Sequence, residues 1–292
     1  MDCVDSVFRF TSDFELIVVD NGSLDSSVSD IEQRFPDSII IKNSKNVGFS
    51  KANNAAIKRA LGRWIVLLNP DTKVTRNWLD NLMKCADRAS EIGIVMPKLL
   101  RMDGKTIDST GHVFDFRTGF TYDRGSGETD VGQYDLVEEV ASCPFACVAI
   151  KTEVILGIGL LDQRMVMYYE DVDYCIRARV AGWRALYCPN SVVLHFRSGV
   201  TPTSSNQVQK RAVAYRLRII LKCYERRDMV KYGALRIFRD IVSAFAGLKN
   251  NDPQYSLGYM RSPIWNLLNI PLVERRLVQS TRKVSDNTLF SE

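Results

Sequence analysis

Five apolar residues, Trp64 to Leu68, stand directly before Asn69-Pro70-Asp71. An apolar run of this length, with β-branched residues in it, predicts a strand buried on both faces. Pro70 ends the strand, because proline cannot donate to the ladder of a central strand. The carboxylate of Asp71 is therefore expected at the carboxyl end of a buried strand, the edge where open α/β sheets bind ligands. The alternative is an ordinary turn after a strand.

A second run of the same design lies earlier in the chain. Residues 15–19 predict another buried strand, and Asp20 follows them directly. The residues in between predict a helix over 23–35, a strand over 38–42 and a helix over 51–61. Strands and helices that alternate with short loops favour a parallel, doubly wound sheet. The sequence therefore predicts an α/β fold with acids at strand ends.

A third acid lies in a cluster at residues 168–173, which read YYEDVD. The apolar residues that follow recur at helical spacing, so a helix is expected to begin here and to end near residue 182. Asp173 and Arg177 are four apart and can form an ion pair on another face of this helix. Asp171 lies outside that pair, beside the free backbone N–H groups of the first turn. Complementarity with the helix dipole explains Glu170 and Asp173, but not the two tyrosines before them.

The middle and the end of this region give weaker signals. Asp103-Gly104 predicts a hairpin. Residues 114–132 are rich in Gly, Thr and Asp, and we expect irregular surface loops that form an acceptor-side region. Two short strands are predicted at 184–187 and 191–194, and His195 ends the second.

Positive charge is concentrated in the C-terminal third. Residues 207 to 240 contain ten Lys and Arg but only three Asp and Glu, while the whole chain has a net charge of only +5. Residues 213–224 and 235–245 predict two amphipathic, cationic helices. They either pack on the preceding domain or contact an anionic membrane surface, and the cations expected at the membrane are Arg218, Lys222, Arg226 and Arg227. The tail after residue 250 gives no assignment. We divide the chain into a domain at 1–204 and a helical region at 205–292.

Composition excludes several classes of protein. The chain is 46% hydrophobic and 25% charged, as is usual for a water-soluble globular protein. No segment reaches the ~18 apolar residues of a membrane span, and residues 1–10 do not form a secretory signal. Seven cysteines without a CxxC pair favour reduced core thiols. We expect a cytoplasmic protein, peripheral on the inner face of the plasma membrane if its basic helices bind lipid.

Three acids at element edges and one late histidine suit a nucleotide-diphosphate site with a divalent cation. The negative charge of a diphosphate must be neutralised before it can leave. Asp71 and His195 together would form a mixed oxygen and nitrogen site, compatible with Mg²⁺ or Mn²⁺. A separate carboxylate is needed to accept the proton of an attacking hydroxyl, and Asp171 is the candidate.

At this point the chain resembles family 2 glycosyltransferases, and within them the rhamnosyltransferase-like branch, over about residues 14–198. The resemblance implies a GT-A fold and inverting transfer of a sugar from a nucleotide-sugar donor to a hydroxyl of a glycan or lipid-linked acceptor, in the synthesis of surface polysaccharide. The motifs that carry it are DNGS at 20–23, NVGF at 46–49 with Asn53 and Asn54, LNPD at 68–71, YYEDVD at 168–173 with Arg177, and His195.

The resemblance also implies a role for individual residues. Asp171 matches the catalytic base, Asp71 the last acid of the DxD motif that binds metal and diphosphate, and His195 the late histidine near the metal. Glu170, Asp173 and Arg177 support them. The residues implied to bind the nucleotide sugar are Asp20, Asn21, Ser23, Asn46, Gly48, Phe49, Asn53, Asn69 and Asp71.

Two departures from the family pattern keep other functions open. Residues 2–10 correspond to the helix after the family's first strand, so that strand is missing and an unpaired edge is expected beside 16–19. The DxD motif is reduced to residues 69–71, which leaves one acid for the metal. A weak or inactive nucleotide-sugar-binding relic is one alternative. A nucleotidyltransferase is another, although no basic Gly-rich loop for a triphosphate is present. No nucleic-acid partner is predicted.

Overall fold

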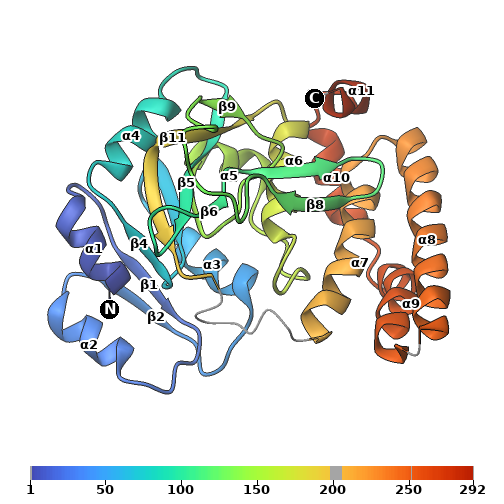
Figure 1. Ribbon diagram of the computed structural model, residues 1–292, viewed down its shortest axis with the longest axis horizontal. Coiled ribbons are helices and arrows are strands. Elements are labelled where there is room, and N and C mark those ends of the chain that lie inside the picture. The colour runs from blue at the N-terminus through green and yellow to red at the C-terminus, as the bar shows by residue number, and fades with distance from the viewer. Residues whose placement is uncertain (1, 198–205, 251, 292) are drawn as a thin grey trace.

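The structure is a computed structural model that describes residues 2–197, 206–250 and 252–291, without the side chains of 206–211. An α/β part occupies one side of the molecule, and a layer of C-terminal helices covers the other (Figure 1). The boundary predicted between residues 204 and 205 lies outside the described residues.

The core of the α/β part is a mixed sheet of seven strands. β5 and β11 run parallel in its centre, and the other pairs are antiparallel, so the parallel sheet that the alternation of strands and helices favoured is wrong for this sheet. β10 is buried at every position, as expected for a strand covered on both faces. The order along the sheet is β3 (Trp64–Leu68), β10 (Cys147–Lys151), β5 (Ile92–Arg101), β11 (Arg184–His195) and β4 (Thr72–Val74), with β6 (Ile107–Ser109) beside β5 and β9 (Glu138–Glu139) beside β11.

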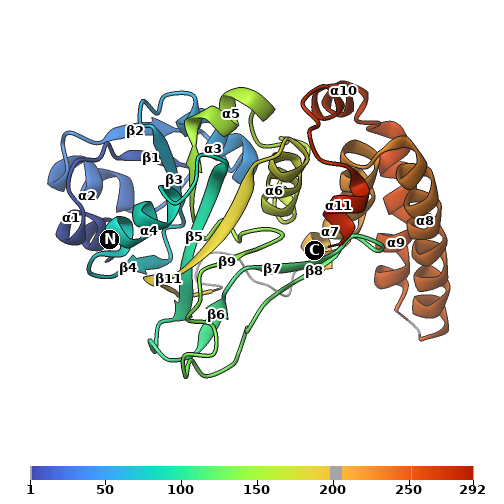
Figure 2. The same cartoon turned by 90° about the horizontal axis from the view of Figure 1, so that it is seen from above.

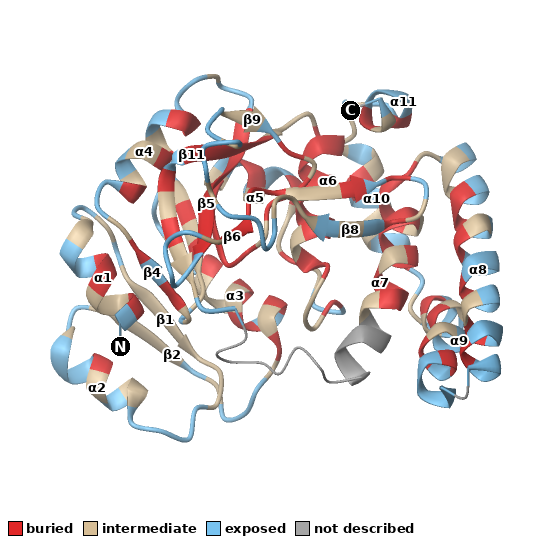
Figure 3. Cartoon of the chain, in the orientation of Figure 1, coloured by how far each residue is buried: buried red, intermediate tan, exposed pale blue. Residues whose placement is uncertain are grey.

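Helices pack on this sheet and bury its side chains (Figure 3). The predicted strand at 64–68 is confirmed, but only Ile65 and Leu67 of it are buried, because β3 lies at the end of the sheet and is not covered on both faces as expected. All seven cysteines are buried and free of disulfides. One core cluster lies around the sheet, and a second lies around α6 and α7. The helices of this part are α3 (Phe49–Ile57), α4 (Trp78–Ala86), α5 (Thr152–Ile158) and α6 (Glu170–Val180).

β1 (Ile17–Asp20) and β2 (Ile39–Lys42) form a separate parallel pair, in which Ile17 lies opposite Ile39. Within the described residues no strand joins this pair to the seven-stranded sheet, because β3 pairs only with β10. The unpaired edge expected beside residues 16–19 is therefore confirmed. α1 (Asp2–Phe10) and α2 (Ser27–Arg34) lie in the same part of the molecule (Figure 1).

Two local predictions are wrong. Residues 114–132 are not only irregular loops, because β7 (His112–Asp115) and β8 (Phe120–Asp123) form an antiparallel hairpin. The two short strands predicted after residue 183 are one strand, β11, whose register against β5 shifts between Cys188 and Val192. The shift lets a single strand continue past Pro189, which cannot donate to the ladder.

The unassigned tail after residue 250 is helical. α7 lies between α6 and the outer pair α8 and α9 (Figure 2). None of the helices in the described residues is both long and apolar enough to cross a membrane. The C-terminal helices are α7 (Asn206–Cys223), α8 (Arg226–Lys249), α9 (Pro253–Leu268), α10 (Leu272–Ser280) and α11 (Asp286–Phe290).

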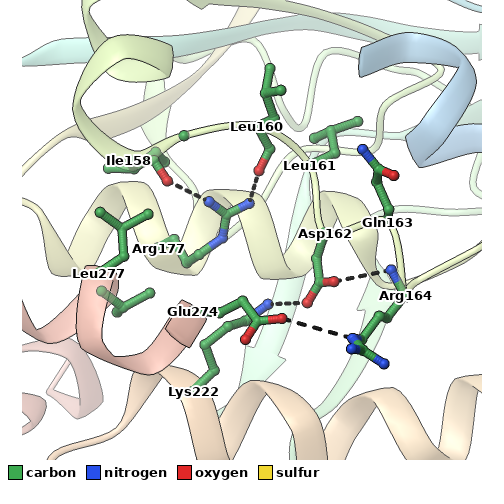
Figure 4. Close-up of a pocket in the computed structure, with 12 residues that line it drawn as sticks. Ile158, Leu160, Leu161, Asp162, Gln163, Arg164, Arg177, Lys222, Glu274 and Leu277 are labelled. Atoms are coloured by element: carbon green, nitrogen blue, oxygen red, sulfur yellow. Dashed lines mark hydrogen bonds and ion pairs between the residues drawn. The ribbon is translucent and has the colours of Figure 1, made fainter. Parts of the chain in front are cut away.

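Buried ion pairs fix α7 on the α/β part. Arg218 Nε and Lys222 Nζ each lie 2.7 Å from Asp162 Oδ2, and Lys222 also lies 2.6 Å from Asp173 Oδ1. Asp162 and Lys222 also line a cavity of about 270 Å³, together with Glu274 of α10 (Figure 4). Arg218 and Lys222 have almost no exposed surface, so the prediction that they face a membrane is wrong. Their charges are paired with carboxylates inside the protein.

We expect Asp162→Asn to lower the free energy of unfolding by about 3 kcal/mol, because it leaves two buried cations short of a carboxylate. Burial raises the pKa of Asp162, but the charges of Lys222 and Arg218 outweigh it and hold this pKa far below its usual range. The stabilisation is therefore present above about pH 4 and declines as the pH falls below it. Urea unfolding at pH 7 and at lower pH measures both effects. Exposed Asp37→Asn is the control, and equal stability of the two variants at pH 7 would contradict the argument.

Candidate active site

The loop after β1 is organised by Asp20. Its Oδ1 accepts hydrogen bonds from the backbone N–H groups of Gly22 (3.2 Å) and Ser23 (2.8 Å). The bond from Ser23 is the main reason that the pKa of Asp20 is lowered. The carboxylate therefore shapes the turn that carries Asn21 and Ser23.

Asn21 joins this turn to the loop before α3. Its Nδ2 donates to Asn46 Oδ1 (3.0 Å), and its Oδ1 accepts from the backbone N–H of Val47 (2.9 Å). Asn46 Oδ1 also accepts from the backbone N–H of Gly48 (2.9 Å). The structure thus brings together the first two motifs of the sequence.

The same loop packs against the segment that leads into α6. Gly48 has a φ of +89°, and a Cβ there would lie 2.6 Å from Val166 Cγ1. The backbone N–H of Phe49 donates to Val166 O at 2.8 Å. Among the described residues the side chain of Asn53 bonds only to Phe49 of its own helix, whereas buried Asn54 holds Leu161 by two hydrogen bonds. Asn54 is therefore a structural residue of this contact.

The backbone before α6 is strained. Tyr168 and Tyr169 have φ values of +68° and +65°, a conformation that aromatic residues rarely adopt. Such strain persists only where the surroundings impose it, and it concentrates at functional sites. Here Arg216 Nε of α7 donates to the hydroxyl of Tyr169 at 2.7 Å. The strained turn places the next two residues, Glu170 and Asp171, at the start of the helix.

These two acids differ in their surroundings. Glu170 is buried, and its Oε2 has no hydrogen-bond partner among the described residues. Burial and then the charge of Asp171 raise the pKa of Glu170 well above its usual range, which favours its neutral form. Asp171 is partly exposed. Burial raises its pKa as well, but the charge of His112 opposes the shift.

Asp173 and Arg177 lie on another face of α6. Their predicted ion pair is present, with Nε 2.9 Å from Oδ2. Arg177 also donates to the carbonyls of Ile158 and Leu160, as Figure 4 shows. Both residues hold the helix in place, and neither lies with Asp171.

The end of β11 meets the turn between β3 and β4 at His195, which lies opposite Thr72. His195 Nε2 lies 3.5 Å from Asp71 Oδ1, so the structure brings together two residues that the sequence separates by more than a hundred positions. The backbone N–H of Asn69 bonds to Ala146 O and fixes the turn. His195 Nδ1 lies 2.8 Å from Asp108 Oδ2 of β6. Burial lowers the pKa of His195, but the bonds to Asp108 and Asp71 outweigh it and raise this pKa to about 9.

Four residues that sequence reasoning missed extend this contact toward α6: Asp108, His112, Asp123 and Arg197. Arg197 lies 3.0 Å from Asp108 Oδ1 and 2.7 Å from Asp123 Oδ2. His112 Nε2 lies 3.3 Å from Asp123 Oδ1. Burial lowers the pKa of His112, but the carboxylates of Asp123 and Asp171 raise it overall. Alternating charges thus run from Asp71 to the start of α6.

A sequence signal for these residues existed in part. Asp108 and His112 flank Ser-Thr-Gly inside a strand-like stretch, where polar side chains need partners. The partners themselves come from β8, α6 and the end of β11, which only the folded chain brings near.

The geometry of Asp71 and His195 fits a divalent cation. Their oxygen and nitrogen are close enough to share an ion, and Asp108 holds the other ring nitrogen, as carboxylates commonly do for metal-bound histidines. Among the described residues, the group of three acids close enough together to hold a metal ion is Glu225, Asp228 and Asp286, in the C-terminal part and not at Asp71. A cation at Asp71 would therefore need further ligands from a diphosphate or water.

The chain is similar to known glycosyltransferases. The family model "Glycosyl transferase family 2" matches residues 2–137. The N-acetylglucosaminyl-diphospho-decaprenol L-rhamnosyltransferase of Mycobacterium tuberculosis is 26% identical over 208 residues, which are 64% of this chain and 67% of that protein. The uncharacterized protein y4gI of Sinorhizobium fredii is 28% identical over 195 residues, which are 63% of this chain. The chain spans only 21% of the length of y4gI.

The fold is that of GT-A glycosyltransferases, as predicted. The mannosyltransferase PcManGT from Pyrobaculum calidifontis, in complex with GDP-Man and Mn²⁺, superposes with a TM-score of 0.53 at 14% identity. The match covers 91% of this chain and 82% of that one, so it includes part of the C-terminal helices.

We expect Gly48→Ala to destabilise the protein by about 2 kcal/mol, because the methyl group would meet Val166 at a backbone angle that alanine disfavours. Hydrogen exchange should show the loss at residues 165–171. Gly104→Ala is the matched control, since Gly104 also has a positive φ but nothing within 4 Å of a Cβ. If both variants lose the same stability, the contact with Val166 contributes nothing.

Proposed function

We propose that this protein, whose residues 2–137 match glycosyl transferase family 2 and which has a GT-A fold, is an inverting glycosyltransferase. It would move a sugar from a nucleotide-diphosphate sugar to a hydroxyl group. The acceptor is a glycan or a lipid-linked sugar in surface polysaccharide synthesis. A relative that is named as acting on diphospho-decaprenol supports the lipid-linked form.

The observation that carries the proposal is the line of charges between Asp71 and Asp171. Asp71 and His195 lie at one end of it, where a diphosphate and its cation can bind. Asp171 lies at the other end, partly exposed at the start of α6, where the charge of His112 acts on it. The two functions that sugar transfer needs, support of the leaving group and removal of a proton, are thus held by one network.

In the proposed reaction Asp171 accepts the proton of the acceptor hydroxyl. The hydroxyl oxygen forms a bond to the anomeric carbon from the face opposite the diphosphate. The bond between that carbon and the phosphate oxygen breaks, and its electron pair leaves with the nucleoside diphosphate. Neutral Glu170 does not compete for the proton, and His112 favours the ionised form of Asp171.

Asp71 and His195 would hold a divalent cation, Mg²⁺ or Mn²⁺. When bound, the cation neutralises charge on the leaving diphosphate. Asn21, Ser23, Asn46, Gly48 and Phe49 would line the nucleoside pocket beside Asp20, and Asn53 and Asn69 would complete the donor site. The protein would act in the cytoplasm, peripheral on the inner face of the plasma membrane, where a lipid-linked acceptor is reached.

Turnover of a panel of UDP-, GDP- and dTDP-sugars with Mn²⁺, with and without acceptor, tests the proposal. Release of nucleoside diphosphate and formation of a glycoside with inverted anomeric configuration is the expected result. Pyrophosphate release from a nucleoside triphosphate and a sugar phosphate would instead identify a nucleotidyltransferase. Binding of a nucleotide sugar without turnover would identify a relic.

Asp171→Asn is expected to lower kcat by ~10²–10⁴ while the Kd of the donor changes little, because an amide cannot accept the proton. Rapid-mixing kinetics and calorimetric donor titration measure the two quantities. Glu170→Gln serves as the comparison and should lose much less, since it replaces a neutral acid by a neutral amide. Near-normal kcat for Asp171→Asn would assign the base to another residue.

Asp71→Ala is expected to abolish the Mn²⁺ dependence of nucleoside diphosphate binding, because the carboxylate no longer holds the cation. His195→Ala should lose less, as one supporting ligand. Asp108→Asn should weaken Mn²⁺ binding by about 10–100-fold through the orientation of the imidazole. Titration of Mn²⁺ against nucleoside diphosphate measures all three, and unchanged metal dependence in Asp71→Ala would remove Asp71 from the site.

A further inference from the structure

The outer surface of α8 and α9 is apolar although it faces solvent. On α8 the exposed side chains include Phe238, Val242 and Phe245, and on α9 they include Ile264 and Leu268. Phe245 is 67% exposed and Leu268 is 77% exposed, so these side chains project away from the fold. α8 and α9 form the outermost layer of the molecule (Figure 1).

The contact between α8 and its neighbours has the opposite character. Gly247 of α8 packs so closely on α9 that a Cβ would lie 2.5 Å from Ser256 Oγ. Asn266 Nδ2 of α9 donates to Ala214 O of α7 at 2.8 Å, and Arg236 and Asp240 form an ion pair buried on the inner face of α8. Helices of water-soluble proteins bury their apolar face. Small and polar residues inside, with apolar residues outside, are typical of helices that pack in lipid.

The exposed charges on the helices around the apolar surface are positive, and one exposed acid, Asp252, lies just before α9. Every exposed charged side chain of α8, α9 and α10 is basic. Arg227 and Lys231 precede the apolar part of α8, Lys249 follows it, and Arg261 lies on α9. A second copy docked on this surface would bring like charges together. An anionic lipid headgroup layer would complement them.

We propose that the pair α8–α9 is an interfacial membrane-binding surface, which inserts its apolar side chains at the headgroup boundary of an anionic bilayer and places its basic residues among the phosphates. This differs from binding through charge alone, because Arg218 and Lys222 are buried. It rests on the proposed function only in that the bilayer would present the lipid-linked acceptor.

The surface is connected to the candidate active site. Arg236 Nη1 of α8 donates to Thr118 O, at the tip of the hairpin β7–β8 that carries His112 and Asp123. Arg216 of α7 reaches Tyr169, just before Asp171. An acceptor held at the bilayer by α8–α9 would therefore meet the part of the protein that bears the proposed base.

Sedimentation of the full chain with phosphatidylcholine vesicles, with and without phosphatidylglycerol, tests the proposal. The chain should bind the anionic vesicles, and high salt should weaken this binding without abolishing it. Phe245→Gln with Leu268→Gln should weaken binding at least about tenfold. The matched control is Leu61→Gln with Leu156→Gln, two exposed leucines far from the helices in sequence, and it should bind as the unaltered chain does.

Three results would overturn it: no sedimentation, equal binding of the two double variants, or complete loss of binding in high salt. If the unaltered chain forms a dimer without vesicles, and the double variant Phe245→Gln with Leu268→Gln is a monomer, the surface binds a second copy instead. Circular dichroism checks that the variants are folded. The assay needs no sugar donor, so a chain that binds vesicles but transfers no sugar would refute the proposed function and leave this proposal standing.

Discussion

The carboxylate of Asp173 is fully buried between two cations, Arg177 of its own helix and Lys222 of α7. Removing either partner of a buried ion pair leaves an uncompensated charge in a medium that solvates it poorly. α6 can therefore hold its position only while α7 is docked, and Asp162 reinforces the contact from the loop between α5 and α6. The proposed base lies at the start of α6. It is not a member of these ion pairs, but its position depends on them.

The opposite side of the site is held by charges that are only partly buried. Asp71 comes from the turn before β4, His195 from β11 and Asp108 from β6, and Arg197 with Asp123 carries the contact to His112. Each carboxylate lies beside a cation, so neither end of the line can change its charge without affecting the next group. Such coupling suits a site that must accept a diphosphate at one end and a proton at the other.

The sequence predicted the parts of this site that follow from local pattern. An apolar run before Asp71 and an acid in the first turn of a helix are signals within a few residues, and both were confirmed as structural features. Asp108, His112 and Asp123 gave no comparable signal, because their partners come from distant strands and the hairpin β7–β8 was taken for loops. The resemblance to family 2 glycosyltransferases is confirmed for residues 2–137, yet it named none of these three residues.

The two cationic helices show why periodicity alone could not separate a packed helix from an exposed one. α7 and α8 both carry apolar residues at spacings of three and four with basic residues between them. Burial of α7 became favourable because Asp162 and Asp173, far away in sequence, supply partners for its cations. On α8 the buried cation Arg236 finds its partner within the helix, in Asp240, and no other acid of the described residues pairs with it. Beyond Leu235 the face that α8 buries is therefore neutral, with small residues beside this pair, and the large apolar residues from Ile237 on remain on the outside.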